Sequence, residues 1–574
     1  MENKKNSGGD NGHNSLLRHL EADLDANYHR FAIPHPNKAI ATWYLLTVLE
    51  DNLRNLFVLT DDSDAHVVEF HVDRQKYSAR FALDRIRKDC KDTSQVALPS
   101  RVVPKIYLKT AELIMAGVDF ASASQLCSAA HANSVEFEES DENIEVVVDE
   151  TQHDIRYAAL ELLGHMPLEV IDHSTNLYVW VRNDEFRPRV VDIIADSVRI
   201  SEHRVFYEYL PHIAVALASE MSQHDLLIPE GWRFPWGGRY ETTLLINALC
   251  VRCMYHWIAV HFGASLKSLK GGGKASILYV TSLSTLLQDL QIMCSLDESV
   301  IREFVRYLSY GYGIQTPDPA LQPIIAVGSG QIAIPCLLFL SSNYERSLLI
   351  LQARIDPASF NTLSELFEEK MVSNLLRDIT PRWPLTKANV TIRVSGEFEE
   401  IDLLVADKSS RTLLVCELRW MLQPGDPREV QNRKKACWQK TDQLERKVRW
   451  LRARVTAALQ ELEIDTSDAA NWHVEGVVVI ETFGGVLSRK PEFPIMTTQI
   501  FTQGMLGATS LRNLVSWSHS LCWLPQDHVH FRVVSQSTPL TTIGKNLITH
   551  GIEKLCSLRV YRQFVEQSIA SLKL

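Results

Sequence analysis

The chain has 574 residues, of which 45% are hydrophobic and 22% are charged, and its formal net charge at pH 7 is −11. This length predicts about three domains, and the composition is ordinary for a soluble globular protein. The acidic balance excludes a generally basic nucleic-acid coat protein but leaves a local basic site open.

The cysteines and the N-terminus indicate the cellular compartment. Ten cysteines are scattered singly, apart from Cys250 and Cys253, which favours a reducing cytoplasm over a disulfide scaffold. The N-terminus is polar, with no apolar segment behind its lysines, so no signal peptide is predicted. The best membrane candidate, 242–263, contains an arginine and two histidines, and a buried helix is therefore expected there instead of a membrane span.

The N-terminal half is predicted to be mostly helical. Residues 1–14 are expected to be disordered, 15–150 to form an α+β region, and 151–355 to form a mainly helical region with a short hairpin. Apolar residues at helical spacing predict helices over 16–31, 37–59, 104–130, 151–164, 202–221, 242–262 and 295–308. Alternating patterns predict strands over 65–73, 76–83 and 144–148.

Three further stretches of this half contain recognisable patterns. Residues 322–351 predict two strands around a Gly-Ser-Gly turn, and then a helix capped near Ser342 or Asn343. Eight acidic residues lie between Glu136 and Glu150. They are typical of a nucleic-acid mimic or a partner-binding segment, but a solvated acidic loop is favoured. The loop GWRFPWGGRY, at 231–240, has residues that can stack on bases, although packing of its tryptophans over a core edge is favoured.

Two apparent motifs are assigned to structure. The stretch SLKGGGKAS, at 268–276, lacks the first glycine and the final Ser/Thr of a phosphate-binding loop, so it predicts a flexible turn. Cys250, Cys253, His256 and His261 are residue types that bind zinc. Their flanks form one continuous apolar helical pattern, whereas zinc-binding cysteine pairs lie on turns, and a buried helix is therefore favoured.

The stretch 396–447 carries the clearest chemistry. Apolar runs over 401–406 and 412–416, joined by a few polar residues, predict an antiparallel hairpin. Asp402 begins one strand and Glu417 ends the other, so both are expected at the same end of the hairpin. Two carboxylates held together repel each other, and Mg²⁺ or Mn²⁺ bound by their oxygens relieves the repulsion and can activate water.

This order of aspartate, hairpin and Glu-x-basic resembles the PD-(D/E)xK nuclease superfamily, which has the restriction-endonuclease-like fold. The resemblance implies a core of helix, three strands, helix and strand over 356–500. The segments that match this order are a helix over 360–376, a strand over 390–394, the hairpin, a helix over 426–459 and a strand over 474–482. Arg419 stands where the family has lysine, and arginine can bind phosphate but is a poor proton shuttle.

The helix predicted over 426–459 has two faces. Its expected buried face consists of Cys437, Thr441, Leu444, Val448, Leu451 and Val455. The residues expected on a wetter, nucleic-acid-binding side are Arg433, Lys440, Gln443, Lys447 and Arg454. Between residues 382 and 454, sixteen Lys/Arg stand against ten Asp/Glu, a balance of 16 − 10 = +6. This excess favours a phosphate-binding face, and a merely solvated face is the alternative.

The expected fold is therefore an α/β (α+β) multidomain protein, with a restriction-endonuclease-like mixed-sheet core that follows a mostly helical N-terminal half. A C-terminal α/β extension is predicted over 501–574, with helices over 510–521 and 547–570 and a strand over 529–534.

The resemblance implies a metal-dependent nuclease that acts on nucleic acid, DNA rather than RNA, in restriction or phage defence. The implied ligands of Mg²⁺ or Mn²⁺ are Asp402, Glu417 and the Leu418 carbonyl. Glu368 would complete or orient this shell, and Lys440 or Arg419 would stabilise the transition state. Two alternatives are an inactive nuclease-fold subunit that binds nucleic acid or a protein partner, and a helical scaffold or regulatory protein. A partner for the N-terminal half and a homo-oligomer are left open.

Overall fold

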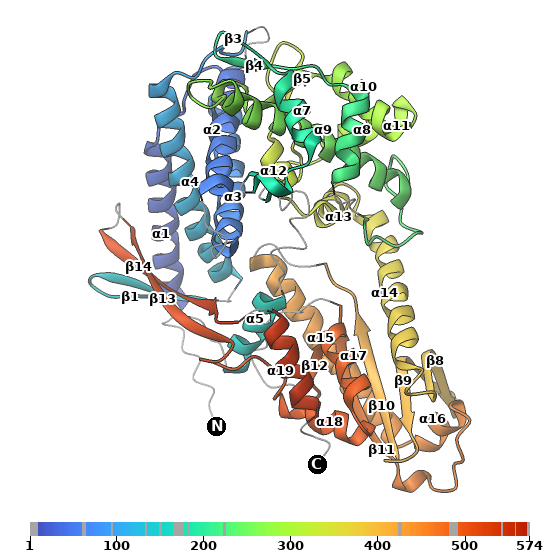
Figure 1. The fold of residues 1–574 in the computed structure, drawn as a ribbon. Helices are drawn as coiled ribbons and strands as arrows, with labels where there is room; N and C mark the ends of the chain where they lie inside the picture. Colours follow the sequence, from blue (N-terminus) through green and yellow to red (C-terminus); the bar gives the residue numbers. More distant parts are fainter. Residues whose placement is uncertain are drawn as a thin grey trace. The chain divides into compact units, whose positions relative to one another are not determined.

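The computed structural model describes residues 10–59, 65–92, 96–132, 135–147, 152–164, 177, 179–181, 183–221, 225–422, 427–481, 492–540, 544–556 and 558–570. The chain forms two compact units, each assembled from stretches that are distant in sequence. The first unit contains residues 1–20, 125–166 and 364–574, and the second contains 21–124 and 167–363. Helices predominate and several sheets accompany them (Figure 1), which confirms the predicted mixed α/β class.

A five-stranded mixed sheet forms the centre of the first unit. Its strands are β8 (Thr386–Val394), β9 (Glu397–Asp407), β10 (Thr412–Arg419), β11 (His473–Ile480) and β12 (Ile495–Thr497). They lie in the order β12-β11-β10-β9-β8. The three strands β8, β9 and β10 are antiparallel neighbours, whereas β11 runs parallel to both β10 and β12.

Two tight turns fix the register of the antiparallel strands. Between β8 and β9, Ser395 and Gly396 have φ angles of 52° and 88°. Between β9 and β10, the Asp407 carboxylate accepts hydrogen bonds from the Ser409 backbone N–H at 2.9 Å and from the Ser410 hydroxyl at 2.6 Å. Burial raises the pKa of Asp407, but these and further hydrogen bonds outweigh burial and lower it. The predicted hairpin over 401–416 is confirmed.

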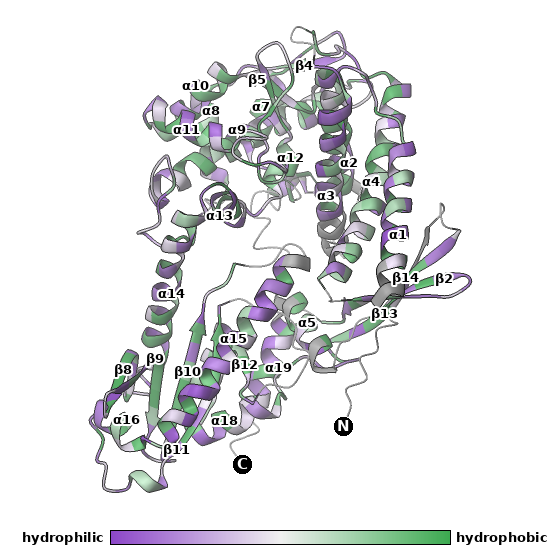
Figure 2. Cartoon of the chain, turned by 180° about the vertical axis from the view of Figure 1, so that it is seen from behind, coloured by the Kyte–Doolittle hydropathy of each residue, from purple (hydrophilic) through white to green (hydrophobic). Residues whose placement is uncertain are grey.

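Helices cover this sheet and complete its core. They are α5 (Gln152–Gly164), α14 (Pro357–Ile379), α15 (Pro427–Arg452), α16 (Val455–Glu461), η4 (Ala469–Asn471), α17 (Thr498–Gly507), α18 (Leu511–Ser520) and α19 (Leu558–Ala570). The strands β9 and β10 are mostly hydrophobic, while α15 mixes both kinds of residue (Figure 2). Helix α15 packs on β10 and β11. Gly476 permits the close approach, because a Cβ there would lie 3.0 Å from the side chain of Leu444.

The buried face of α15 follows the prediction in its first five positions. Cys437, Thr441, Leu444, Val448 and Leu451 are all buried. The helix ends earlier than expected, at Arg452, and Val455 begins the separate helix α16, where it is partly buried. Arg454 divides the two helices with φ −137° and ψ 35°, a conformation outside the helical region.

A second sheet of the first unit joins the acidic stretch to the C-terminal part of the chain. Its strands are β1 (Glu136–Glu139), β2 (Asn143–Val147), β14 (Lys545–Lys554) and β13 (Phe531–Leu540), in that order. The acidic stretch is thus a hairpin rather than a loop, with Phe137, Ile144 and Val146 buried. Some of its carboxylates are paired, since Lys545 Nζ lies 2.6 Å from Glu139 Oε1.

The second unit is largely helical. Its helices are α2 (Lys38–Leu59), α3 (Ala65–Asp89), η2 (Asp184–Phe186), α7 (Arg189–Ser197), α8 (Pro211–Glu220), α9 (Arg239–Leu266), η3 (Lys274–Ser276), α10 (Leu283–Cys294), α11 (Glu298–Tyr307), α12 (Cys336–Leu340) and α13 (Tyr344–Ile355). Helices α1 (Asp10–Arg30), α4 (Pro104–His131) and α14 are divided between the two units. The small sheets are β3 (Arg199–Ser201) with β4 (Arg204–Phe206), and β5 (Tyr279–Ser282) with β7 (Gln331–Ile334) and β6 (Ile325–Ala326). The predicted cap of α13 is confirmed, because the Asn343 side chain accepts from the Arg346 backbone N–H at 2.9 Å.

Four local predictions are wrong. Residues 65–83 form helix α3 instead of strands, because their buried positions, among them Val72, Ala79 and Ile86, recur at helical spacing. The stretch from residue 202 begins with the hairpin β3–β4, whose turn residues Glu202 and His203 have positive φ. Residues 545–554 form β14 because they pair with β13 along their whole length and with the distant strand β2 at 546–548. Residues 10–14 are helical, whereas 1–9 lie outside the described residues.

Two of the described helices are long and apolar enough to cross a membrane by length and composition alone. They are Pro104–His131 and Arg239–Leu266. Half of the apolar window of the first helix and 83% of that of the second are buried inside the protein. Core helices of soluble proteins also pass this test, so the two helices are weak evidence for a membrane.

Candidate active site

The strands β9 and β10 bring Asp402 and Glu417 to one end of the hairpin. Their pairing ends with Cys416 opposite Leu403, and the next step of that register places Glu417 opposite Asp402. Residues opposite each other on antiparallel strands project from the same face of the sheet. Beyond this pair, the Asp402 side chain takes the place of a backbone acceptor. Its Oδ2 accepts a hydrogen bond from the Leu418 backbone N–H at 2.8 Å. The predicted convergence of the two carboxylates is confirmed.

Two lysines of α15 reach the same carboxylates. Lys440 Nζ lies 3.0 Å from Glu417 Oε2 and 3.5 Å from Asp402 Oδ2. Lys447 forms an ion pair with Glu417 Oε1, and its Nζ lies 3.7 Å from Asp402 Oδ1. The two lysines are seven residues apart, which is two helical turns, so both project from one face of α15. The cluster therefore contains two negative and two positive charges.

Burial makes this cluster electrostatically strong. The Glu417 side chain is fully buried, and 26% of Asp402, 19% of Lys440 and 9% of Lys447 side-chain area is exposed. Burial lowers the pKa of Lys440, but the carboxylates of Asp402 and Glu417 outweigh burial and raise it. Glu417 Oε1 makes no hydrogen bond of good geometry within the described structure, although Lys447 pairs with it. The ion pair with Lys447 is therefore the contact that this buried oxygen makes.

Arg419 does not join this cluster. Its Nη1 lies 2.8 Å from Glu368 Oε1 on α14, and the side chains are 47% and 35% exposed. The next residue, Trp420, stacks on Phe367 of α14 with ring centroids 4.1 Å apart. Helix α14 is thus attached to the end of β10 at two points. Glu368 also contributes to the raised pKa of Lys440, so it lies near the charged cluster.

The prediction of a solvent-exposed face on α15 is wrong for two of the five residues assigned to it. Arg433 and Lys447 are buried, because their long aliphatic stems pack inward while their charged ends find acceptors. Arg433 donates to the Met421 carbonyl at 3.2 Å, and Lys447 reaches Glu417. Gln443 is exposed as predicted. Arg454 lies beyond the end of α15 and pairs with Glu397 at 2.6 Å.

Sequence reasoning placed Lys447 on a phosphate-binding surface and missed its place beside the carboxylates. The signal was available in the spacing, since Lys447 follows Lys440 by two helical turns and directly precedes the buried Val448. When a lysine lies at the border of the apolar face of a helix, and that face packs over a buried glutamate, the lysine side chain is expected to point toward the glutamate.

Two carboxylates of this cluster are donors of the kind that Mg²⁺ prefers. Among the described residues no group of three or more His, Cys, Asp or Glu side chains is arranged to hold a metal ion. Asp402 and Glu417 supply two carboxylates, and the Leu418 carbonyl is the third predicted donor. Mg²⁺ is usually bound by one or two carboxylates and several waters. The Lys440 ammonium already lies within 3.5 Å of both carboxylates, so both side chains are directed at one cation position.

The predicted cysteine and histidine string lies along one buried helix. Cys250, Cys253 and His256 are buried in α9. The Tyr207 hydroxyl lies 2.7 Å from His256 Nδ1. Burial, together with the Arg252 charge, lowers the pKa of His256 to about 3. The favoured structural interpretation of these residues agrees with their packing.

The aromatic loop at 231–240 also packs inward. Trp232, Phe234 and Trp236 are buried, which agrees with the favoured interpretation. The Trp232 indole N–H donates to Gln352 Oε1 at 2.8 Å, and the Trp236 indole N–H donates to Thr242 Oγ1 at 3.0 Å. Both indoles are therefore satisfied within the protein and are not displayed for base stacking.

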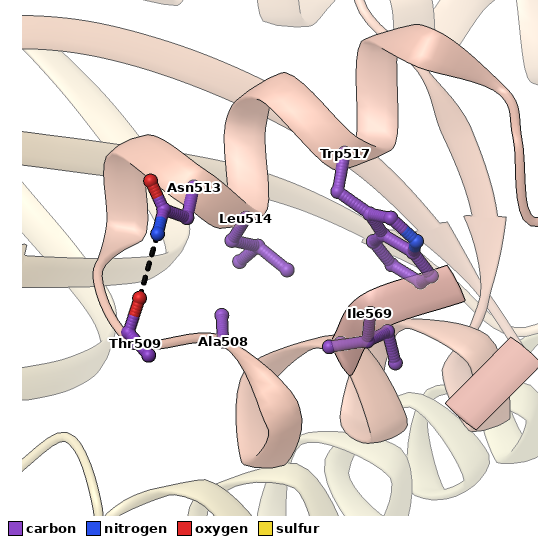
Figure 3. A pocket seen from close by; sticks show the side chains of 7 residues that line it. Ala508, Thr509, Asn513, Leu514, Trp517 and Ile569 are labelled. Atoms are coloured by element: carbon purple, nitrogen blue, oxygen red, sulfur yellow. Dashed lines mark hydrogen bonds between the residues drawn. The ribbon is translucent and has the colours of Figure 1, made fainter. Parts of the chain in front are cut away.

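A small cavity lies between α17, α18 and α19 (Figure 3). Its lining is mostly apolar and includes Leu514, Trp517 and Ile569, and its volume of about 10 Å³ is the space of one water molecule at most. Gly504 leaves this space open, since a Cβ there would lie 2.6 Å from Trp517 Cζ3. The cavity is a packing feature and is too small for a substrate.

Comparison with family models, with curated proteins and with solved structures finds no match to this chain.

Proposed function

We propose that this protein is a metal-dependent nuclease whose active site contains Asp402, Glu417 and Lys440. The observation that carries the proposal is the convergence of two carboxylates, from neighbouring strands, on one ammonium group of the following helix. Carboxylate oxygens bind Mg²⁺ or Mn²⁺, and a fixed ammonium stabilises negative charge on a phosphoryl oxygen. Hydrolysis of a phosphodiester bond uses both functions.

We also propose that the first unit contains a restriction-endonuclease-like core. Support comes from the order of α14, the antiparallel strands β8 to β10, helix α15 and strand β11. This is the order of helix, three strands, helix and strand that the PD-(D/E)xK resemblance implies. The parallel pairing of β11 with β10 after a helical crossover agrees with it.

In this proposal each residue of the cluster has one task. Asp402, Glu417 and the Leu418 carbonyl would hold Mg²⁺, which supplies Lewis-acid polarisation and a bound water of lowered pKa. The Leu418 N–H orients the Asp402 carboxylate. Lys440 retains its proton because its pKa is raised, so it acts as a fixed positive charge and not as a base. Arg419, half exposed and held by Glu368, would contact a phosphate oxygen.

The proposed substrate is nucleic acid, DNA rather than RNA. The local excess of six positive charges between residues 382 and 454, against −11 for the whole chain, supports a phosphate-binding surface. Lys435 and Arg449 are exposed on α15 and have no ion-pair partner among the described residues. The second unit is proposed to select the target or to gate cleavage, in a restriction or phage-defence role.

A catalytically inactive nucleic-acid-binding or partner-binding subunit is the second candidate, and one observation favours it. Lys440 and Lys447 together balance the charges of Asp402 and Glu417, so the cluster is neutral without a metal. An ammonium that stays between the two carboxylates excludes a divalent cation from the same place. Arg419 in place of the family lysine points in the same direction.

The decisive experiment is a cleavage assay on the full-length protein. Supercoiled plasmid, linear duplex, single-stranded DNA and RNA are each incubated with Mg²⁺, Mn²⁺ or EDTA. Cleavage of DNA that requires the metal and is lost in Asp402→Asn supports the nuclease. Binding without cleavage under all metal conditions supports the inactive subunit. Cleavage that persists in Asp402→Asn would place the active site elsewhere.

A further inference from the structure

The second unit contains a pocket that lies outside the proposed active site. Its volume is about 360 Å³. The lining comes from three segments: residues 101–107 around the start of α4, His203 in the β3–β4 turn, and residues 270–275 in the glycine-rich loop after α9. Small-molecule sites in proteins have volumes of about 300–1,000 Å³, so the pocket has the size of a ligand site.

Hydrogen bonds hold the three segments together. The Arg204 guanidinium, next to His203, donates to the Ser100 carbonyl at 3.2 Å and also to the Pro99 carbonyl. The Val205 N–H donates to the Ser276 hydroxyl at 3.0 Å. The β3–β4 hairpin is therefore bonded to both of the other segments, and the walls of the pocket are fixed without a ligand.

A buried carboxylate contacts two lining residues of the pocket. The Asp51 side chain is fully buried and accepts from the Tyr107 hydroxyl at 2.6 Å, while Lys274 Nζ lies 2.8 Å away. Arg54 pairs with the same carboxylate and donates to the Gly272 carbonyl. Burial raises the pKa of Asp51, but Arg54 and the other partners outweigh burial and lower it. Tyr107 and Lys274 are thereby held in the wall of the pocket.

The charged residues that line the pocket are positive. Arg101, Lys270 and Lys274 line it, and none of its described lining residues is acidic. Lys274, which is 38% exposed, shares the single charge of Asp51 with Arg54. Neither Arg101 nor Lys270, both exposed, has an ion-pair partner among the described residues. In a protein of net charge −11, such a concentration of cations in a concave site attracts an anion.

The loop of Gly271, Gly272 and Gly273 gives a ligand access to the backbone. All three residues have positive φ, between 59° and 83°. Nothing lies within 4 Å of the position of a Cβ at Gly271, so that side of the loop is open. Val102, Pro104 and Ala275 are apolar lining residues of the same pocket, and Tyr107 adds an aromatic ring. The pocket thus combines cationic groups with an apolar wall.

We propose that this pocket binds a phosphorylated small molecule of nucleotide size. Lysine and arginine are the side chains that bind phosphate, and the apolar wall would accommodate the uncharged part of the ligand. The sequence pattern of a phosphate-binding loop is absent from residues 268–276, so this site depends on three converging segments and not on one motif. The proposal does not depend on the proposed nuclease.

The test is calorimetric titration of the full chain with pyrophosphate, AMP, ATP and GTP in 150 mM salt with EDTA. We expect at least one of these probes to bind with a dissociation constant below 1 mM. The double variant Arg101→Glu, Lys270→Glu should weaken that binding at least tenfold, since both residues are exposed and their loss should not disturb folding. Circular dichroism and thermal melting of the variant check the fold.

Two controls separate this site from others. Lys91→Glu makes one charge reversal on an exposed residue of the same unit outside the pocket and should bind as wild type does. Asp402→Asn should also bind normally, even if it abolishes cleavage. Absence of binding by all four probes at 1 mM, or binding that is unchanged in the double variant, would overturn the proposal. Pocket-dependent binding of a 5′-phosphorylated oligonucleotide alone would make the pocket a nucleic-acid end site and would equally refute it.

Discussion

The Lys440 ammonium lies 3.0 Å from Glu417 Oε2. This contact joins helix α15 to the fully buried Glu417 carboxylate at the end of the β9–β10 hairpin. A buried carboxylate without a cation is very costly, so Lys440 and Lys447 allow the two acidic residues to lie together when no metal is bound. Metal binding at Asp402 and Glu417 therefore has to displace or shift an ammonium group.

The two carboxylate variants are predicted to share a loss of cleavage and to differ in stability. Asp402→Asn and Glu417→Gln should each abolish metal-dependent cleavage of DNA. Glu417→Gln should also destabilise the first unit by about 3–5 kcal/mol, because it leaves two lysines beside a buried neutral group. Asp402→Asn should cost less, because Asp402 is partly exposed. Denaturant unfolding and single-turnover cleavage measure the two effects.

Glu400→Gln is the matched control for these variants, because Glu400 is exposed on the same strand as Asp402. It should cleave and unfold as wild type does. Equal stability of the Glu417→Gln variant and wild type would mean that the ion pairs of Glu417 contribute no net stability.

Much of the core could be predicted from the sequence because its signals are local. The hairpin over 401–416 has two apolar runs around polar turn residues, and α15 has an apolar face at helical spacing. Asp402 and Glu417 could be placed together because an antiparallel hairpin fixes which of its residues are neighbours. The spacing of Lys447 from Lys440 indicates an inward position, but its contact with Glu417 also depends on how α15 packs against β10 and β11.

The errors lie where distant segments decide the structure. Residues 547–554 have a helical pattern in the sequence, but they pair with β13 along their whole length and, at Leu547 and Ile548, also with β2, which is about four hundred residues away in the sequence. The pocket in the second unit has no contiguous motif, since Arg101, His203 and Lys270 meet only in the fold. The Arg433 guanidinium donates to the carbonyl of Met421, which precedes the helix, and residue spacing alone does not predict this partner.

The nucleic-acid-binding surface of α15 is predicted to include Lys435 and Arg449. Both are exposed and unpaired within the described structure, unlike the buried Arg433 and Lys447. The double variant Lys435→Glu, Arg449→Glu should weaken DNA binding uniformly across sequences and flatten its salt dependence, because fewer counterions are released. Filter binding from 50 to 300 mM salt measures the slope. An unchanged slope, with Lys91→Glu as the control, would assign this face to solvent or to a protein partner.

The stability of the second unit is predicted to depend on the ionisation of Glu50. This fully buried carboxylate accepts from the Leu337 N–H at 2.8 Å and the Leu338 N–H at 3.0 Å. Burial raises its pKa from 4.5 to about 7, although these hydrogen bonds and Arg54 oppose the shift. An acid whose pKa is raised by folding is most favourable to stability below its unfolded pKa, and this contribution disappears as the pH rises through the folded value.

Wild type should therefore lose stability relative to Glu50→Gln between about pH 4.5 and 7. Thermal melting of both proteins across pH 4 to 8 measures the difference. Glu112→Gln, at an exposed position of α4 in the same unit, should show no such trend relative to wild type. A constant difference between wild type and Glu50→Gln across this range would show that Glu50 does not titrate there.

Lys440 and Arg419 are predicted to contribute unequally to the cleavage rate. Lys440 contacts both carboxylates, whereas Arg419 pairs with Glu368 and is half exposed. If the protein cleaves DNA, Lys440→Met should reduce the rate at least a hundredfold, which corresponds to about 2.7 kcal/mol of transition-state stabilisation. Gln439→Met, at an exposed position of the same helix outside the proposed binding surface, should leave the rate unchanged. Arg419→Lys should be tolerated, because either side chain keeps a positive charge beside Glu368.

Metal binding by the same variants separates catalysis from charge balance. Removing the Lys440 ammonium frees the position between Asp402 and Glu417, so Lys440→Met should bind Mg²⁺ at least as tightly as wild type while it cleaves more slowly. The Mg²⁺-dependent rise in melting temperature measures this affinity. In an inactive subunit, wild type neither cleaves nor binds Mg²⁺, and only Lys440→Met gains Mg²⁺ binding. An active wild type that is indifferent to Lys440→Met but inactivated by Arg419→Lys would reverse the assigned roles, with Arg419 as the residue that contacts the scissile phosphate.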